Sequence, residues 1–340
     1  NFPEDALEHK LVDELKYEDE VMSELRNKLK LKEKDKINFV SNAKYAKAKG
    51  KKKEKADEKI AVIYAIGQIN SGEGDDDEIG SETIATAIKD ARLDDKVKAI
   101  VLRVNSPGGS ALASEIIWRE AVLAKKAKPF IVSMGDVAAS GGYYISCAAD
   151  KIFAQPNTIT GSIGVFGMVP NFKRAFEDKL GITIDTVNTN KYSDVMTTMR
   201  AATPTESVYI QKSVEKIYDV FIGRVADGRK MSKEQVDSIG QGRVWSGSDA
   251  LKINLVDELG SLHDAILFAA KKANLKNYKV MDLPKQKNPF DELFSKIETE
   301  SEARMVKKSM GEYYGYWKHV KSLMNNKGVY ARVPYDFIIQ

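Results

Sequence analysis

Ser140 is the side chain best placed for nucleophilic chemistry in this chain of 340 residues. The residues around it are small: Ala138, Ala139, Gly141 and Gly142. They leave room for another backbone to approach the hydroxyl, and the helix expected at residues 140–149 offers free N–H groups at its start. A nucleophilic serine needs both features. A tightly packed strand-to-helix turn without chemistry would use the same residues, so the neighbouring stretches decide between the two interpretations.

Two other turns of small residues have a similar form. Residues 105–110 read Asn-Ser-Pro-Gly-Gly-Ser after a buried-strand pattern, and their two glycines expose backbone N–H groups. Residues 158–164 read Thr-Ile-Thr-Gly-Ser-Ile-Gly and form a third, hydroxyl-rich turn at a strand edge. Three such turns in succession indicate a single site.

These motifs, with Met-Gly-Asp-Val-Ala-Ala-Ser-Gly-Gly-Tyr at residues 134–143 between them, resemble the signal peptide peptidase A (protease IV) family. The resemblance runs from about residue 60 to residue 259. It implies a Ser/Lys peptidase with an α/β fold of the Clp protease/crotonase type, built of stacked ββα units with outer helices. It also implies that the substrate is a cleaved signal peptide, apolar and extended, at the periplasmic side of a bacterial inner membrane.

Chemistry and the resemblance together assign roles to the residues of the three turns. Ser140 attacks a peptide carbonyl, and the main-chain N–H groups of Gly108 and Gly141 point at the developing oxyanion. Gly109 keeps that turn open, and Ser162 orients the amine of a lysine. The substrate groove is expected to be lined by Val165, Phe166 and Met168.

The general base is the least certain part of this site. The three histidines, His9, His263 and His319, lie in segments away from the Ser140 turn, which argues against a Ser-His-Asp triad. Lys191 is the one lysine in a segment that matches the family, but the register that aligns Tyr192 and Asp194 puts Ser193 at the family's lysine position. We therefore expect the lysine to come from an upstream copy of the unit, with Lys191 as the alternative base.

An internal repeat supports the upstream copy. Residues 5–15 and 249–259 are identical at eight of eleven positions, and the second occurrence closes the serine-bearing unit. The first occurrence should therefore close an earlier copy, although two similar helix ends could share this pattern by chance. The long form of the family is such a duplication, with the lysine in the first copy and the serine in the second.

The chain divides into three parts on this interpretation. Residues 1–59 hold the end of the preceding copy, a connecting helix and a lysine-rich linker; residues 60–284 form the catalytic domain; residues 285–340 are an extension without an assigned role. Alternating strand and helix patterns predict βαβ units. Strands are expected at residues 60–66, 97–104, 130–134, 151–154, 163–167 and 182–189. Helices are expected at residues 81–92, 110–126, 140–149, 171–180, 205–226, 232–239 and 262–273.

Composition excludes several other classes of protein. The net charge of +4 gives no reason to expect nucleic acid as a partner. Neither a metal-ligating cluster nor a phosphate-binding loop occurs in the sequence, so we expect no cofactor and no metal. The single cysteine, Cys147, is expected to be a small buried residue. No apolar run reaches the length of a membrane span, so any membrane association is assigned to a segment outside these residues.

The repeat also predicts assembly. A site completed by another copy lies at an interface, and a contact repeated with a fixed rotation closes a ring. We expect a closed homo-oligomer, with four chains as the favoured number and Ser140 facing the interior. Two other classes stay open: an acyl-CoA enzyme of the crotonase type, which would share the fold and the Gly-Gly turn, and a noncatalytic assembly domain.

Overall fold

The computed structural model describes residues 3–32, 35–47, 56–74, 78–284 and 328–332. The chain separates into two compact units, Asn1–Glu54 and Lys55–Gln340. Parts of the lysine-rich linker and most of the expected C-terminal extension lie outside the described residues. The three-part domain division therefore stays a prediction.

The first unit consists of helices α1 (Pro3–Glu8), α2 (Glu18–Lys28) and α3 (Asn42–Lys47). It contains the first occurrence of the repeat. Leu11 and Val12 are 78% and 41% exposed there, whereas their counterparts in the second unit, Leu255 and Val256, are 0% and 1% exposed. The matching Leu-Val pair is thus buried in the second occurrence of the repeat and exposed in the first.

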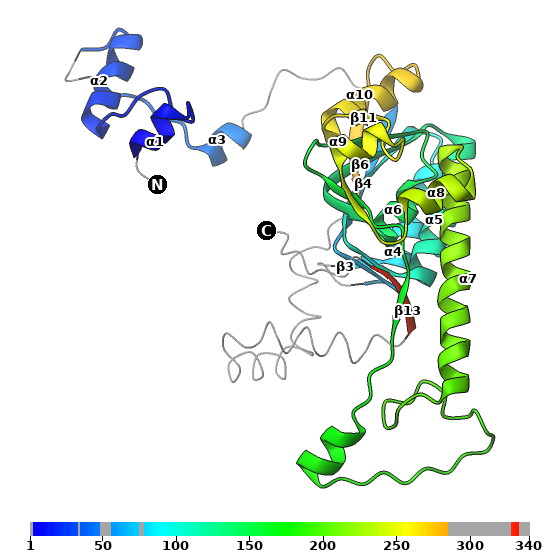
Figure 1. The fold of residues 1–340 in the computed structure, drawn as a ribbon. Coiled ribbons are helices and arrows are strands. Elements are labelled where there is room, and N and C mark those ends of the chain that lie inside the picture. Colours follow the sequence, from blue (N-terminus) through cyan, green and yellow to red (C-terminus); the bar gives the residue numbers. More distant parts are fainter. Residues whose placement is uncertain (1–2, 33–34, 48–55, 75–77, 285–327, 333–340) are drawn as a thin grey trace, which may run out of the picture. The chain divides into compact units, whose positions relative to one another are not determined.

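The second unit is built on a mixed sheet of eight strands, whose main path runs β10-β8-β6-β4-β1-β12 (Figure 1). All of its pairings are parallel except that of β10 with β8, while β7 pairs with β6 and β11 with β7. Its strands are β1 (Lys59–Ile66), β4 (Val97–Ser106), β6 (Phe130–Ala139), β7 (Lys151–Ala154), β8 (Ile159–Gly161), β10 (Val244–Ser246), β11 (Glu258–Leu259) and β12 (Lys279–Leu283).

Alternate residues of the central strands face opposite sides of this sheet, and both sides are covered. Leu102 belongs to the core beneath helices α4 (Ser81–Leu93), α5 (Ala111–Ala127) and α6 (Gly141–Ser146), while Val101 packs towards α10 (Leu262–Lys272). Both side chains are fully buried. Burial on two faces explains why these strands read as nearly continuous apolar runs.

A second, smaller sheet has the order β3-β2-β5-β13-β9. It is formed by β2 (Gln68–Asn70), β3 (Glu78–Gly80), β5 (Gly108–Ser110), β9 (Phe166–Met168) and β13 (Gly328–Arg332). Helices α7 (Pro204–Arg229), α8 (Lys233–Ile239) and α9 (Gly247–Lys252) and the π-helix η1 (Ala175–Lys179) complete the second unit. The α/β fold with outer helices is as expected from the sequence.

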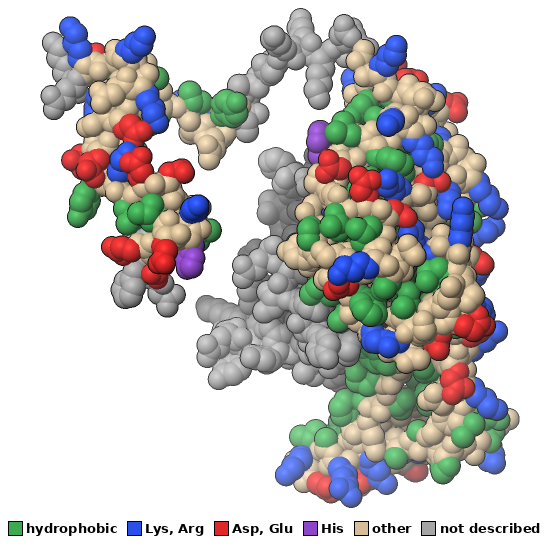
Figure 2. All heavy atoms as spheres, turned by 45° about the horizontal axis from the view of Figure 1, so that its top comes forward, with side chains coloured by type: hydrophobic (Ala, Val, Ile, Leu, Met, Phe, Trp, Pro, Cys, Tyr) green, Lys and Arg blue, Asp and Glu red, His purple; other side chains and the backbone are tan. Residues whose placement is uncertain are grey.

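Helix α7 and the segment before it form an arm that projects beyond the two sheets (Figure 1). The helix begins with Pro204 after a capping box, in which Thr203 accepts from the backbone N–H of Glu206 and the Glu206 carboxylate accepts from that of Thr203. Hydrophobic side chains of residues 180–187 reach the surface of this arm (Figure 2). Within the described residues, no helix is long and apolar enough to cross a membrane.

Five sequence-based expectations need correction. One is the strand expected at residues 163–167, of which only residues 166 and 167 belong to a strand, β9. The strand expected at residues 130–134 continues to Ala139, so it leads directly into Ser140, and the helix that follows is shorter than expected, Gly141–Ser146. Residues 182–189 form no strand because no partner strand lies beside them in the described part of the chain. Residues 171–180 are helical only from residue 173, mostly as the π-helix η1.

Candidate active site

Ser140 lies at the point where β6 ends and α6 begins, in a strained backbone conformation. Its φ and ψ are 53° and −115°, outside the regions that residues with a side chain ordinarily occupy. Such a conformation costs on the order of 1–3 kcal/mol and persists only when its surroundings enforce it. Strained residues cluster at functional sites, as at the nucleophile turn of α/β-hydrolases.

Two backbone hydrogen bonds and one close approach enforce this conformation. The N–H of Ser140 donates to the carbonyl of Gly161 at 2.9 Å, and its carbonyl accepts from the N–H of Tyr144 at 2.8 Å. A Cβ on Gly142 would lie 2.8 Å from the carbonyl oxygen of Ser106, so only glycine fits there. The small residues around Ser140 therefore let two strand ends meet at the hydroxyl.

The Ser140 hydroxyl itself is not used by the fold. Its oxygen is buried, it has no hydrogen-bond partner among the described residues, and it does not cap α6. An unsatisfied buried hydroxyl typically costs about 1–3 kcal/mol. Strain and an unpaired hydroxyl at the same residue are a combination that folding alone does not favour, whereas a nucleophile that must remain reactive requires a free hydroxyl.

The glycine turn that was expected to bind the oxyanion lies beside this residue. Ser106, at the end of β4, is in register with Ala138 of β6, which brings the following Gly108 to the Ser140 turn. The N–H of Gly108 donates to the Ser106 hydroxyl at 3.1 Å. A Cβ on Gly109 would lie 2.0 Å from the carbonyl oxygen of Ile69, so this glycine is required for β5 to approach β2.

Sequence reasoning missed the role of Ser106. Its hydroxyl is fully buried and accepts from the N–H expected to serve the oxyanion. The hydroxyl therefore fixes the orientation of the Gly108 amide within the turn. The signal was present in the Asn-Ser-Pro-Gly-Gly motif, in which a buried serine precedes the glycines by two residues.

Asn105 and Thr160 fix the last residues of β6 by side-chain hydrogen bonds. The Oδ1 atom of Asn105 accepts from the N–H of Val137 at 3.0 Å, across a register shift between β4 and β6. The hydroxyl of Thr160 donates to the carbonyl of Ala138 at 2.7 Å. These contacts hold the strand end that carries Ser140 from both of its neighbours.

Ser162 lies in the third turn, and it too has a positive φ, of 45°. Its N–H donates to the carbonyl of Arg243 at 2.7 Å, and its hydroxyl donates to the carbonyl of Gly242 at 3.3 Å. A cavity of about 470 Å³ opens beside Ser162. Its lining is partly apolar and includes Val165 and Phe166 of the expected substrate groove. The residues that line it are Ser162, Gly164, Val165, Phe166, Gln211, Val214, Glu215, Tyr218, Gln241 and Gly242.

No lysine of the described residues bonds to Ser140 or Ser162. Lys191 lies in the arm, where its ammonium group is 5.3 Å from the ring centre of Tyr192. The structure therefore does not bring the alternative base to the nucleophile, and the histidines His9 and His263 form no hydrogen bond with it either.

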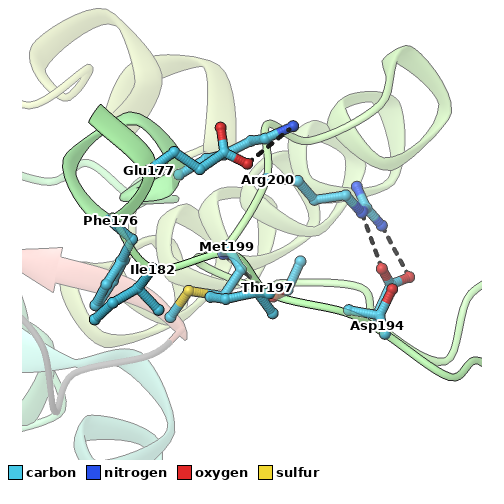
Figure 3. A pocket seen from close by; sticks show the side chains of 10 residues that line it. Phe176, Glu177, Ile182, Asp194, Thr197, Met199 and Arg200 are labelled. Atoms are coloured by element: carbon cyan, nitrogen blue, oxygen red, sulfur yellow. Dashed lines mark hydrogen bonds and ion pairs between the residues drawn. The ribbon is translucent and has the colours of Figure 1, made fainter. Parts of the chain in front are cut away.

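The arm is instead fastened by Arg200. Its guanidinium forms paired hydrogen bonds with Asp194, at 2.9 Å each, and with Glu206, at 2.8 and 2.7 Å. Figure 3 shows the pair with Asp194 at one side of a pocket into which Phe176 and Met199 project. The hydrogen bonds from Arg200 lower the pKa of Glu206 to about 2.

Behind Ser140, α6 is anchored in the core. The Tyr143 hydroxyl donates to the carbonyl of Leu255 at 2.8 Å, and burial raises the pKa of Tyr143 well above its ordinary value. Burial also raises the pKa of the Cys147 thiol to about 12. Cys147 is thus a buried structural residue, as the sequence indicated. No group of residues able to hold a metal ion occurs in the described part of the chain.

Comparisons with family models give the same class of fold. The family model of Clp protease matches residues 51–161, and that of peptidase family S49 matches residues 123–276. A ClpP1 mutant from Listeria monocytogenes superposes with a TM-score of 0.40 at 17% identity, covering 60% of this chain and 94% of that one. The fold is α/β of the Clp protease type.

Two curated relatives show to which family the chain belongs. Protease 4 of Salmonella typhi is 49% identical over 220 residues, which are 64% of this chain and 35% of that protein. The protein named "Putative protease MJ0651" of Methanocaldococcus jannaschii is 35% identical over 237 residues, which are 68% of this chain and 76% of that protein. The chain belongs to peptidase family S49, and it spans about a third of the length of Protease 4.

Proposed function

We propose that this chain is the serine-bearing half of a peptidase with a Ser/Lys dyad that hydrolyses extended apolar peptides such as cleaved signal peptides. The observation that carries the proposal is Ser140 beside a glycine turn: its backbone is strained, and its buried hydroxyl has no partner among the described residues. Its attack on a peptide carbonyl forms a tetrahedral intermediate. The N–H groups of Gly108 and Gly141 bind the oxyanion, and loss of one such donor typically costs about 2.7–4 kcal/mol in the barrier.

The proton of Ser140 needs a neutral amine as its acceptor. We assign that amine to a lysine of another copy of the unit, because Lys191 does not contact the site and the described residues offer no other base there. The cavity beside Ser162 has room for such a side chain, and the Ser162 hydroxyl can exchange its long bond with Gly242 for a bond to the amine. Burial among Val165 and Phe166 would lower the pKa of that lysine.

The repeat supports the existence of that copy. Leu11 and Val12 match the buried Leu255 and Val256, yet both are exposed. Covering them as their counterparts are covered would contribute about 1.5–3 kcal/mol for each side chain. A preceding Clp-like unit would supply that cover, as an upstream half would in the longer relatives.

Assembly and location are parts of the same proposal. A base that comes from another copy places Ser140 at an interface, and we propose a closed homo-oligomer, a tetramer of tandem chains. Folded proteins could not enter the interior of such an oligomer, so its substrates would be limited to extended peptides. We place it at the bacterial inner membrane, on the periplasmic side, held by a segment outside this chain.

A direct test uses the full-length protein and a serine-directed fluorophosphonate. Wild type should be labelled at Ser140 and should cleave apolar peptides, and Ser140→Ala should do neither. The control Ser213→Ala, an exposed serine on α7, should keep both properties. Labelling elsewhere would refute the assignment of the nucleophile. Thioester turnover without peptide cleavage would favour an acyl-CoA enzyme, and no reaction at all a noncatalytic assembly domain.

A second test concerns the base. The 340-residue chain alone should fold but cleave peptides far more slowly than the full-length protein. Equal rates would show that the base lies within these residues, and Lys191→Met would then have to abolish activity.

A further inference from the structure

One carboxylate lies in the wall of the cavity beside Ser162. Helix α7 contributes four residues to this wall, Gln211, Val214, Glu215 and Tyr218, which recur at the spacing of a single helix face. The side-chain amide of Gln211 donates to Oε1 of Glu215 at 3.0 Å, and Glu215 forms no ion pair within the described part of the chain. Of the described residues that line the cavity, Glu215 alone carries a charge at neutral pH.

The rest of the cavity wall includes two aromatic rings and aliphatic side chains. Val165 and Phe166 lie in the wall together with the residues of α7. The hydroxyl of Tyr218 donates to Asp237 at 2.6 Å and accepts from the N–H of Gln241 at 3.1 Å. This hydroxyl is therefore engaged within the protein, and the ring of Tyr218 is what remains for a ligand.

A carboxylate, two aromatic rings and aliphatic side chains in one cavity fit a particular kind of ligand group. A cation is attracted by the carboxylate and by the faces of the rings. A long aliphatic stem packs on apolar side chains while its charged end stays with polar groups. Lysine and arginine side chains combine the two features, so the cavity suits a basic side chain better than an apolar or an acidic one.

The cavity also lies next to the candidate nucleophile. Ser162 follows Gly161, whose carbonyl accepts from the N–H of Ser140 at 2.9 Å. A substrate side chain that fills the cavity therefore belongs to a residue close to the carbonyl that Ser140 attacks.

The proposed base is not the cation that Glu215 would bind. The lysine that accepts the proton of Ser140 must be neutral, and a carboxylate paired with it would raise its pKa and keep it charged. At roughly 30 Å³ for each of its five heavy atoms, that side chain takes up about a third of the 470 Å³ cavity. The remaining volume admits a second side chain, and a cation on it would neutralise the carboxylate.

We propose that the cavity beside Ser162 is a subsite for a lysine or arginine side chain of the extended peptide, with Glu215 as its specificity-determining residue. This inference rests on the proposed function for its place near the cleaved bond, whereas binding of the basic side chain requires no catalysis. The substrates are then extended apolar peptides that carry a basic residue close to the bond that is cut. A partly exposed ion pair together with one cation–π contact corresponds to about a fivefold to thirtyfold gain in affinity.

Binding is measured with full-length protein that carries Ser140→Ala, so that no peptide is cleaved. The probes are fluorescent ten-residue peptides of leucine and alanine, each with a single lysine at a different position, and a matching set with norleucine in place of lysine. Norleucine has the same aliphatic stem without the ammonium group. At one position the lysine peptide should bind about five to thirty times more tightly by anisotropy, and the difference should shrink at high salt. Equal affinities at every position, or no binding at all, would overturn the inference.

Variants of Glu215 assign the preference to this residue. Glu215→Gln keeps an acceptor for Gln211 and removes the charge, so the preference for lysine should disappear, and Glu215→Lys should instead favour a glutamate peptide. Asp227→Asn is the matched control, because this exposed carboxylate lies on the same helix, about 18 Å further along, and does not line the cavity. A preference for lysine that survives Glu215→Gln would refute the assignment.

The cleavage assay separates this inference from the proposed function. With Ser140 present, the lysine peptide should have a higher kcat/KM than the norleucine peptide, and Glu215→Gln should abolish the difference. If both peptides are cleaved with the same kcat/KM, the proposed function stands and the subsite is wrong. If the binding preference holds but no protein cleaves peptides, the subsite stands and the proposed function fails.

Discussion

Replacing Ser140 by alanine should remove activity and at the same time stabilise the protein. In most buried serines the hydroxyl is bonded, and its removal costs about 0.5–1.5 kcal/mol. The Ser140 oxygen is buried without a partner among the described residues, so the substitution removes a desolvation penalty of about 1–3 kcal/mol and no bond. The strain at φ 53° is not relieved, because alanine also has a Cβ.

Ser146 provides a control of opposite sign in the same helix. Its hydroxyl is buried and donates to the carbonyl of Gly142 at 2.6 Å, so Ser146→Ala should destabilise the unit by about 0.5–1.5 kcal/mol. Ser140→Gly also relieves the backbone strain, which contributes about 1–3 kcal/mol. The freedom of glycine in the unfolded chain costs about 0.5–1 kcal/mol, so this variant should be at least as stable as Ser140→Ala.

The assay is urea unfolding of the full-length protein, followed by alkylation of Cys147. This thiol is buried in the unit that carries Ser140, so its labelling, read by mass spectrometry, reports the unfolding of that unit alone. The midpoint should rise for Ser140→Ala and fall for Ser146→Ala. A fall of more than about 1 kcal/mol for Ser140→Ala would show that its hydroxyl is a bonded structural group, and the argument for a free nucleophile would fail.

Three further predictions follow from local contacts. Gly109→Ala places a Cβ 2.0 Å from the carbonyl of Ile69, which displaces the glycine turn and should lower kcat/KM for peptides at least about 100-fold in steady-state assays. Because Arg200 lowers the pKa of Glu206 from about 4.5 to about 2, the contact stabilises the arm above pH 4.5. That contribution is lost as the pH falls from 4.5 through 2, so hydrogen exchange in the arm should rise over this range. Glu206→Gln should reduce the dependence to the part contributed by Asp194, whose pKa Arg200 also lowers. The Cys147 thiol, with its pKa near 12, should resist iodoacetamide at pH 8 until the unit unfolds, whereas labelling of the native protein would contradict its burial.

The sequence predicted those parts of the fold that depend on local pattern. Continuous apolar runs gave the buried strands, and the three small-residue turns were expected to lie together. Residues 182–189 show the limit of this reasoning, since they have the composition of a strand but a strand needs a partner, and the described residues supply none. The pairing of residues 328–332 lies at the other extreme, because nothing local connects them with Gly108 or Met168. The role of Ser106 depends on one hydrogen bond across a tight turn, which no periodicity reveals.

Several unsatisfied features of this chain lie in its second unit and in the repeat before it. Among the described residues, the Ser140 hydroxyl has no partner and no base, and residues 182–189 have no partner strand. Leu11 and Val12 lack the cover that their counterparts have. Each of these features needs a different kind of partner. Residues 182–189 need another backbone, Leu11 and Val12 need an apolar surface, and Ser140, as the proposed nucleophile, needs an amine. Another copy of the same Clp-like unit contains all three. In the proposed assembly, further copies of this unit would complete both the site and the packing, so no partner of a different fold is required.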